Sequence, residues 1–498
     1  MALSHFCVAA VTLACRGPLA LSATELALRK RAKQALPLQE RSAAVELYMY
    51  LKSFRRRAGH FKDRRTFGRH CHKLAVLGLI VLLPTAGRGG VVNTAITSKA
   101  IYSSAESSFL PGQEGLRLKR GLNLLVFESA RVNVSSKTAV YLELKQSLAD
   151  NFTRAEIFKL YFSARLAGLS VLLGKDSFNI GPAENGLLLS KNAAPFPMLR
   201  IANEKPLRIL GDWYFLVLNG WFYDSDSGAR TPQLIAVRAR YSPWSALALG
   251  VTRTSYYGGP GRPGYTLWEY PKLLLGANEN VVGSRYDTDG YLGYDITLAL
   301  PEKLFPAAIK SAKLYYEDAG TDVQACWQKE DSCKKYYFPF GIRLQLRSYT
   351  GGLVAETDRD RFRFEFQCVN GQFYTHHWYP VEAYQGLSFG SPYGRNLQQF
   401  FFSHERKTGE RSGFKYEFGY IRQPAFARWD SLNPGAERYY ASFALSKGRG
   451  KVTVEPFARL DMTKNRNSDI APVAPGGFRT IKGNRLFVTL GLSATLGF

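Results

Sequence analysis

The chain has 498 residues, with 66 Lys and Arg against 40 Asp and Glu, a formal net charge of +26, and 13% aromatic residues. This length suits two or three ordinary domains or one large barrel. The sequence holds no apolar run of about eighteen residues or more, which argues against a membrane-spanning helix. A closed β-barrel is the other structure that satisfies its backbone across a bilayer.

A basic segment, 51–73, is followed directly by an apolar segment, 74–87, that ends in small residues. A basic region, a short apolar run and a small-residue end are the parts of a secretory signal. We therefore predict a signal peptide over residues 49–87, with a short buried helix as the alternative. Residues 1–48 are then expected to be a non-native or unstructured extension. Residues 88–120 are expected to form a short periplasmic segment before the barrel.

From about residue 121 to residue 498, short segments alternate apolar and polar residues. In "RFRFEFQ", residues 361–367, phenylalanines alternate with charged and polar residues, and the final segment 485–498 keeps the alternation with a single exception. Alternation with a period of two indicates a β-strand with one apolar face. Soluble strands usually run to about five or six residues. A strand as long as the last one is expected to cross a bilayer obliquely.

Ten successive connections, counted back from the carboxy terminus, alternate between long and short. The longest covers residues 258–290 and its neighbour only 242–244, while residues 350–360 form one of the predicted turns. Long outer loops and short periplasmic turns are typical of bacterial outer-membrane barrels. We predict an all-β fold: a transmembrane antiparallel up-and-down β-barrel of about 18 strands over residues 121–498, in the bacterial outer membrane.

Two segments resemble a known family. One is "GKDSFNIGPAENGLLLSKNAAPFPMLRI", residues 174–201, and the other runs from a "GGPGRP" turn to a "GYD" strand, with "KLYYEDAGTD" downstream. Together they resemble the Wzi-type capsule assembly proteins. The resemblance implies an eighteen-stranded outer-membrane barrel that binds capsular polysaccharide or exopolysaccharide and helps attach or assemble it at the cell surface. Members are regarded as lectins and carry a periplasmic helical segment, for which this chain shows no sustained helical periodicity.

The longest outer loop and its flank are rich in aromatic residues and arginine. Aromatic faces stack on sugar rings, and the guanidinium fork pairs with carboxylates. We predict that an acidic polysaccharide binds five residues of this region, namely Tyr257, Arg262, Tyr265, Trp268 and Arg285. The alternative is that the aromatics form an interfacial girdle and the cations pair with lipopolysaccharide phosphates or with carboxylates of the chain.

Other partners follow from the same location. We expect contacts with outer-membrane lipid and lipopolysaccharide. The terminal Phe498 resembles the signal that the barrel-insertion machinery recognises, and nucleic acid is not expected as a partner. In an oxidising compartment, Cys326 and Cys333 are expected to form a small disulfide, with Cys368 free or competing. Three unrelated buried thiols are the alternative.

Two further classes of function remain open on the residues alone. A general porin would use the same barrel, and an outer-membrane hydrolase would need a nucleophile facing a base. The sequence shows no nucleophile elbow, phosphate-binding loop or zinc-ligand spacing. We therefore predict no enzyme activity, no catalytic residues, no metal site and no cofactor.

Overall fold

A computed structural model describes residues 92–498, with gaps. The gaps are 105–107, 110–113, 150–151, 224–230, 260, 277–278, 280–282, 307, 326–341, 375, 377–378, 380–382, 385–386, 425–434 and 468–479. The predicted signal segment and the extension before it lie outside the described residues. Among the described residues, no helix is long and apolar enough to cross a membrane.

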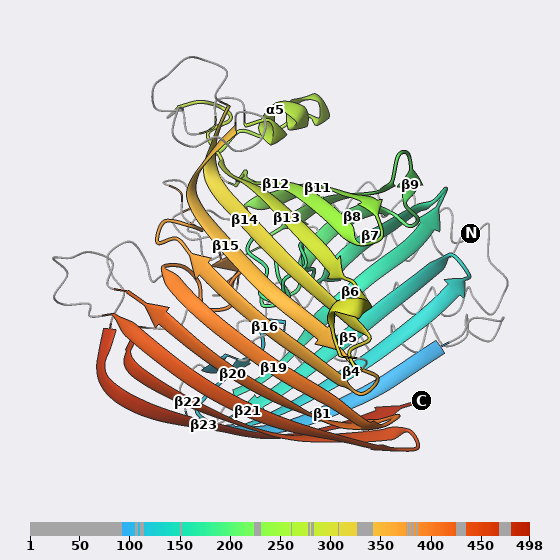
Figure 1. Ribbon diagram of the computed structural model, residues 1–498, viewed down its shortest axis with the longest axis vertical. Helices are drawn as coiled ribbons and strands as arrows, with labels where there is room; N and C mark the ends of the chain where they lie inside the picture. Colours follow the sequence, from blue (N-terminus) through green and yellow to red (C-terminus); the bar gives the residue numbers. More distant parts are fainter. Residues whose placement is uncertain are drawn as a thin grey trace, which may run out of the picture. The chain divides into compact units, whose positions relative to one another are not determined.

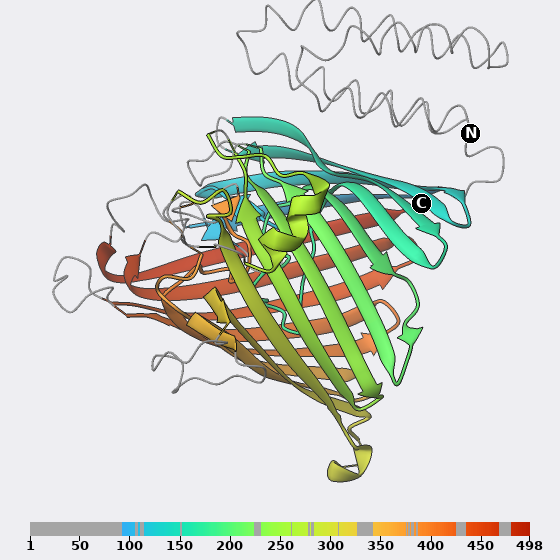
Figure 2. The same cartoon turned by 90° about the horizontal axis from the view of Figure 1, so that it is seen from above.

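One antiparallel sheet forms the wall of a barrel (Figures 1 and 2). It has nineteen strands, of which β9 (Leu207–Arg208) is a two-residue addition, so eighteen make the wall. These are β1 (Val92–Ser103), β4 (Gly121–Ser135), β5 (Thr138–Ala149), β6 (Phe152–Leu166), β7 (Leu169–Asp176), β8 (Phe196–Asn203), β10 (Asp212–Trp221), β11 (Gln233–Trp244), β12 (Leu247–Tyr257), β13 (Asp289–Leu300), β14 (Ser311–Ala325), β15 (Ile342–Glu356), β16 (Asp360–Val369), β19 (Leu397–Gly409), β20 (Ser412–Gln423), β21 (Ala436–Arg449), β22 (Val452–Asn467) and β23 (Thr480–Gly497).

The remaining elements are short. They are β2 (Ser108–Phe109), β3 (Arg117–Leu118), η2 (Leu267–Glu269), α5 (Tyr270–Leu274), η3 (Glu302–Leu304), β17 (Ala383–Tyr384) and β18 (Leu387–Ser388). Strands β2 and β3 pair with each other, as do β17 and β18, outside the main sheet. The predicted all-β architecture and strand number are confirmed.

The barrel closes through its first and last strands. Strand β1 pairs antiparallel with β23 on one side and with β4 on the other. The backbone N–H of Phe498 donates to the carbonyl of Thr94 at 2.9 Å. The wall therefore has no open edge, which removes the unpaired backbone groups that lipid could not satisfy.

The start of the barrel differs from the prediction. Residues 88–120 were expected to precede the wall, yet β1 lies within them, so that prediction was wrong. The outward face of β1 carries Ile96 and Tyr102, which are 40% and 48% exposed, interleaved with Thr94 and Ser98. Because Thr94 and Ser98 interrupt the apolar residues of this face, the alternation of apolar and polar residues is too weak to see in the sequence.

The two faces of the wall follow the predicted alternation. In β16, Phe362 and Phe364 are exposed on the outside, whereas Glu365 and Gln367 are buried on the inside. In β23, Leu490 and Leu492 are exposed on the outside, whereas Thr489 and Ser493 are buried on the inside. Such a surface is stable where the outer face meets lipid and the inner face meets polar groups.

The long connections lie at one end of the barrel, which we call the long-loop end and which also holds the two-residue connection between β5 and β6. We call the opposite end the short-turn end. One predicted turn was placed wrongly: residues 350–360 were expected to be a turn, but β15 continues to Glu356 and only 357–359 turn. The pair Gly351 and Gly352 lies inside β15 and does not mark a turn. A Cβ at Gly352 would collide with the ring of Tyr315 on the neighbouring strand, so this glycine makes room for a side chain.

Candidate functional site

The lumen is occupied by a connection from the long-loop end. Residues 177–195, between β7 and β8, fold inward and are called the plug segment. Its Leu187, Leu189 and Ala193 are at most 1% exposed, and they pack with residues of the wall and of the connection 370–396. The plug segment therefore has an apolar core of its own inside the barrel.

Two carboxylates of the wall hold the plug segment. The backbone N–H of Ala183 donates to Glu317 Oε1 at 2.8 Å. The N–H groups of Glu184 and Asn185 donate to the carboxylate of Glu365 at 3.0 and 3.2 Å, and the Asn185 amide adds a bond of 3.1 Å. Because a buried donor left without an acceptor is costly, these contacts fix the plug segment to β14 and β16.

The connection 370–396 holds the plug segment from the long-loop end. The N–H of Ser190 donates to the carbonyl of Phe389 at 2.8 Å, and its hydroxyl donates to that of Gly390 at 2.6 Å. The Tyr374 hydroxyl donates to the carbonyl of Leu187. A third connection, 104–120, also reaches the plug segment, through the Glu114 N–H at 3.0 Å from the carbonyl of Lys191.

The connection 258–288 forms a small unit at the long-loop end that carries η2 and α5 (Figure 1). Leu273 of α5 is buried against Ile235 and Tyr257. The Tyr257 hydroxyl lies 2.7 Å from Asn219 Oδ1 and 3.0 Å from the Tyr270 hydroxyl. Tyr257 therefore anchors this unit to the wall, and its buried ring is not presented to a ligand.

Three of the predicted residues meet or lie close together on the surface of this unit. The Arg285 guanidinium carbon lies 5.8 Å from the centre of the Tyr265 ring, and the Tyr265 hydroxyl donates to the Arg285 carbonyl at 2.6 Å. Burial raises the pKa of Tyr265 to about 12, so its hydroxyl remains a donor at neutral pH. Trp268 is 86% exposed and lies one residue before Glu269, the ion-pair partner of Arg285.

Glu269 sets the position of Arg285. Arg285 Nε lies 2.9 Å from Glu269 Oε1, while the Thr266 N–H and hydroxyl donate to Glu269 Oε2 at 2.7 and 2.9 Å. This arrangement is a capping box at the start of η2. The two Thr266 hydrogen bonds, assisted by Arg285, hold the pKa of Glu269 below its ordinary value.

The lowered pKa of Glu269 predicts the pH range over which Arg285 keeps its place. A depressed carboxylate pKa contributes stability fully above the unfolded value, and that contribution is lost as the pH falls through the folded value. We expect the environment of Trp268 to stay constant from neutral pH down to about 4.3, the ordinary Glu pKa, and to change only below it. Trp268 fluorescence measured against pH, with the other tryptophans replaced, checks this; a transition near pH 6 would contradict it.

Arg262, predicted to bind the polysaccharide, makes a contact within the unit. Its guanidinium donates to the backbone carbonyl of Asp287. The Asp287 carboxylate is fully buried and lies 3.4 Å from His376 Nε2. Arg262 thus ties the middle of the unit to its end, and its charge acts on Tyr265, as that of Arg285 does.

The comparisons with known proteins agree with this architecture. The family described as capsule assembly protein Wzi matches residues 93–438. The chain belongs to the Wzi capsule assembly family. The resemblance predicted from the sequence is therefore confirmed, and the match includes β1, the strand that the sequence analysis missed.

A solved structure shows the same fold. The chain is similar to Escherichia coli Wzi, an outer membrane protein involved in group 1 capsule assembly and a carbohydrate-binding β-barrel. The TM-score is 0.57 and the sequence identity is 13%, and the comparison covers 84% of this chain and 87% of that chain. Pseudomonas aeruginosa OpdL gives a TM-score of 0.47 and 9% identity, over 82% of this chain and 99% of the other. No curated protein sequence matches the chain.

Sequence reasoning on the residues missed the plug of this Wzi family barrel. The sequence does carry a signal: "GLLLS", residues 186–190, is an apolar run inside a connection, where a solvated loop would be polar. In the sequence this run indicated only the resemblance to the family. The contacts of the preceding Glu184 and Asn185 with Glu365 join residues about 180 positions apart in the chain, so no local pattern predicts them.

The predicted cysteine pair, Cys326 and Cys333, lies outside the described residues. Within the described part of the chain, Cys368 on β16 is a free thiol. The disulfide stays a prediction: peptides of the unreduced protein are expected to contain a Cys326–Cys333 crosslink by mass spectrometry. Three thiols that react with an alkylating agent in the native protein would contradict it.

Proposed function

We propose that this barrel binds an acidic capsular polysaccharide or exopolysaccharide at its long-loop end and helps attach or assemble it at the cell surface. The observation that carries the proposal is the surface formed by Arg285, Tyr265 and Trp268. A guanidinium held over one aromatic ring, with an exposed indole nearby, offers a carboxylate partner and stacking faces together. Family membership supports the same function.

Each predicted residue has a defined place in this proposal. Arg285 is 48% exposed and keeps donor groups at the surface beyond its bond to Glu269. Trp268 supplies an open face for a sugar ring, and Tyr265 supports the guanidinium. Tyr257 and Arg262 hold the unit in shape, so they act through the position of the others.

Binding without chemical conversion fits this site better than an enzyme does. The charged groups at the surface are an arginine and its paired glutamate, and Glu269 is already committed to Arg285 and Thr266. A hydrolase would need an acid and a base on either side of a scissile bond. We propose that the protein retains polymer without cleaving it.

The porin alternative is less well supported because of the plug segment. A general channel needs a continuous water path, whereas residues 177–195 cross the lumen and bond to the opposite wall. We also propose that the outer face contacts lipid and lipopolysaccharide. Strand β23, whose end at Phe498 is exposed at the short-turn end, would engage the insertion machinery.

A deletion strain tests the proposed function. Cells lacking the protein are expected to shed polysaccharide that wild-type cells keep attached, with total synthesis unchanged. The measurement compares the polysaccharide in the washed cell pellet with that in the medium. An unchanged ratio would contradict the proposal, and a loss of total polysaccharide would point to a role in synthesis instead.

A further inference from the structure

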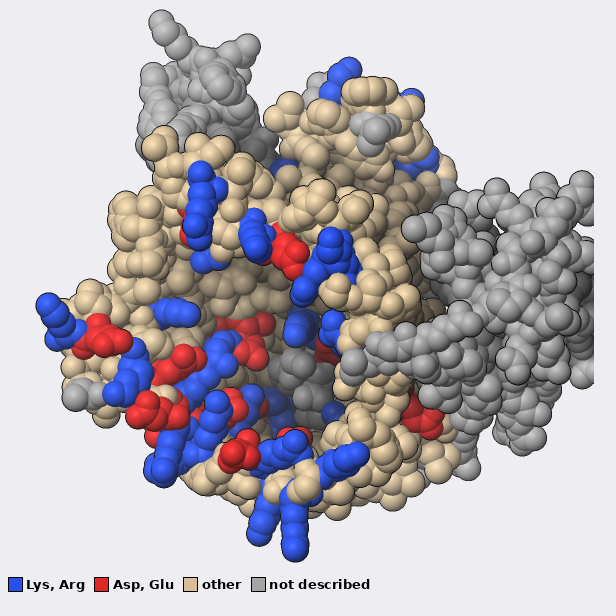
Figure 3. Space-filling view, turned by 90° about the vertical axis from the view of Figure 1, so that its right-hand side faces the viewer, with Lys and Arg blue, Asp and Glu red and all other residues tan. Residues whose placement is uncertain are grey.

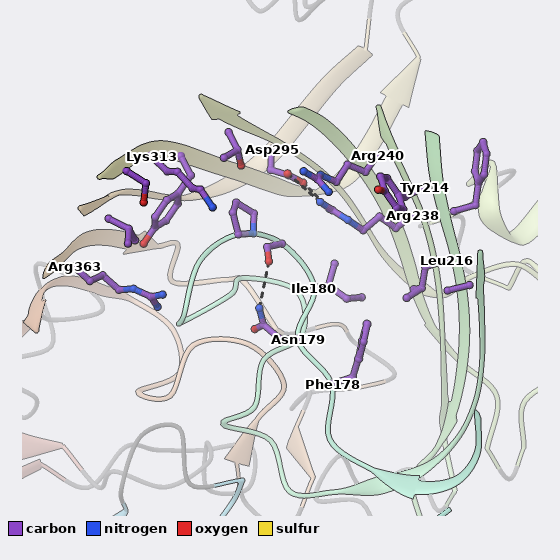
Figure 4. A pocket seen from close by; sticks show the side chains of 18 of the residues that line it. Phe178, Asn179, Ile180, Tyr214, Leu216, Arg238, Arg240, Asp295, Lys313 and Arg363 are labelled. Carbon is purple, nitrogen blue, oxygen red and sulfur yellow. Dashed lines mark hydrogen bonds and ion pairs between the residues drawn. The ribbon is translucent and has the colours of Figure 1, made fainter. Parts of the chain in front are cut away.

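A cavity lies inside the barrel, on the short-turn side of the plug segment. It has a volume of about 510 Å³. Its lining includes Ser311 at the start of β14 and Glu356 at the end of β15, which places it near the short turns. Residues Phe178–Pro182 of the plug segment form its roof (Figure 4). We call this space the basic chamber.

The basic chamber is rich in cationic side chains. Its cations are Arg238, Arg240, Lys313, Arg361 and Arg363, and its carboxylates are Asp295 and Glu356. Figure 3, which views the end of the barrel that carries the carboxy terminus, shows Lys and Arg around a hollow, interspersed with Asp and Glu. Cations concentrated between low-dielectric walls attract anions from solution.

Three of these cations have carboxylate partners. Arg238 forms a two-pronged pair with Asp295, at 2.5 and 3.0 Å. Arg361 Nε lies 3.3 Å from Glu356 Oε1. Arg363 pairs with Glu184 of the plug segment. These pairs belong to the wall and the plug and leave little charge for a ligand.

The other two cations are different. Among the described residues, Arg240 and Lys313 have no carboxylate partner, and both side chains are exposed to the chamber. Arg240 lies over the ring of Tyr214, with 5.5 Å between the guanidinium carbon and the ring centre. Figure 4 shows Arg240, Lys313 and Tyr214 on the wall around the same space. One available cation therefore stands over an aromatic ring, and a second lies on the wall of the same chamber.

We propose that the basic chamber binds a carboxylate-bearing oligosaccharide of a few sugar units, which enters from the short-turn end. Arg240 and Lys313 would receive carboxylates, and Tyr214 would pack against a sugar ring. The volume falls within the range of about 300–1,000 Å³ that is typical of small-ligand sites. The proposal takes only its class of ligand from the proposed function. The two sites are otherwise independent, because the plug segment separates the chamber from the long-loop surface.

Calorimetric titration of the purified, folded barrel with trigalacturonate tests this proposal, with maltotriose as the neutral probe. Trigalacturonate is expected to bind and maltotriose is not. Arg240→Ala combined with Lys313→Ala should weaken binding roughly tenfold, which corresponds to about 1.4 kcal/mol shared by the two charge contacts. Lys407→Ala combined with Lys451→Ala removes two cations at other short turns and should leave binding unchanged.

Three results would overturn the proposal: equal affinity for the two probes, wild-type affinity in the Arg240 and Lys313 variant, or full competition by an equal concentration of inorganic phosphate. Heat-modifiable mobility in gels confirms that each variant is folded. A chamber variant that loses trigalacturonate binding yet retains polymer on cells would support two separate sites. Unchanged polymer retention in the deletion strain would contradict the proposed function and leave the chamber result standing.

Discussion

Replacing Glu365 by alanine is expected to open the barrel to ions. Glu365 is 1% exposed and accepts hydrogen bonds from two backbone N–H groups and one amide of the plug segment, and from the Tyr315 hydroxyl at 2.7 Å. Each buried donor left without an acceptor costs about 1–3 kcal/mol. Since several donors lose their acceptor together, the plug segment should detach from β16.

Conductance in planar bilayers measures this effect. The wild-type barrel is expected to pass little current, and Glu365→Ala should give frequent, large openings. Glu405→Ala is the matched control, because Glu405 lies on the adjacent strand β19, pairs in register with Arg361 and is exposed. A folded Glu365 variant with wild-type conductance would show that Glu317 and the connection 370–396 suffice to hold the plug. A wild type that conducts freely would favour the porin alternative.

Removing Arg262 and Arg285 together is expected to loosen polymer retention at the cell surface. Each exposed charge contact is worth less than about 1 kcal/mol, so a single replacement should have a small effect. The double replacement removes a surface guanidinium and the bond that ties Arg262 to the carbonyl of Asp287. We expect a visible rise in shed polysaccharide with wild-type barrel assembly and heat-modifiable mobility.

Two further variants separate charge from shape. Arg285→Lys keeps the charge and loses the planar fork, and it should retain polymer at an intermediate level. Lys451→Ala at a short turn should have no effect. If the double variant retains as much polymer as the wild type does, we would assign binding to the aromatic residues Tyr265 and Trp268 instead. If the variant fails to assemble, both arginines are structural.

Much of the wall could be predicted from the sequence because each strand meets two different environments. Phe362 and Phe364 face outward and Glu365 and Gln367 inward, so the pattern of residues 361–367 reports the fold directly. Strand β1 escaped prediction because Thr94 and Ser98 share its outer face with Ile96. The turn predicted at 350–360 was wrong because Gly352 lies within β15, where it makes room for the ring of Tyr315 on β14.

The candidate site was predictable only in part. Composition identified the connection 258–288, and the structure brings Tyr265 and Arg285 together there, with Trp268 exposed close by. Composition could not show that Tyr257 is buried, because its burial depends on packing with Leu273 and on the hydrogen bond to Asn219. The plug segment and the basic chamber depend on contacts between residues far apart in the chain, which alternation and composition do not encode.

Direct binding to the cell's own surface polysaccharide tests the central proposal most closely. The purified barrel, held in detergent, is titrated with that polysaccharide, and the variant with Trp268→Ala and Arg285→Ala is titrated in parallel. We expect saturable binding by the wild type that weakens with added salt, and binding at least roughly tenfold weaker in the variant if the two contacts add. No binding by the folded wild type, or equal binding by the two proteins, would contradict the assignment of this surface.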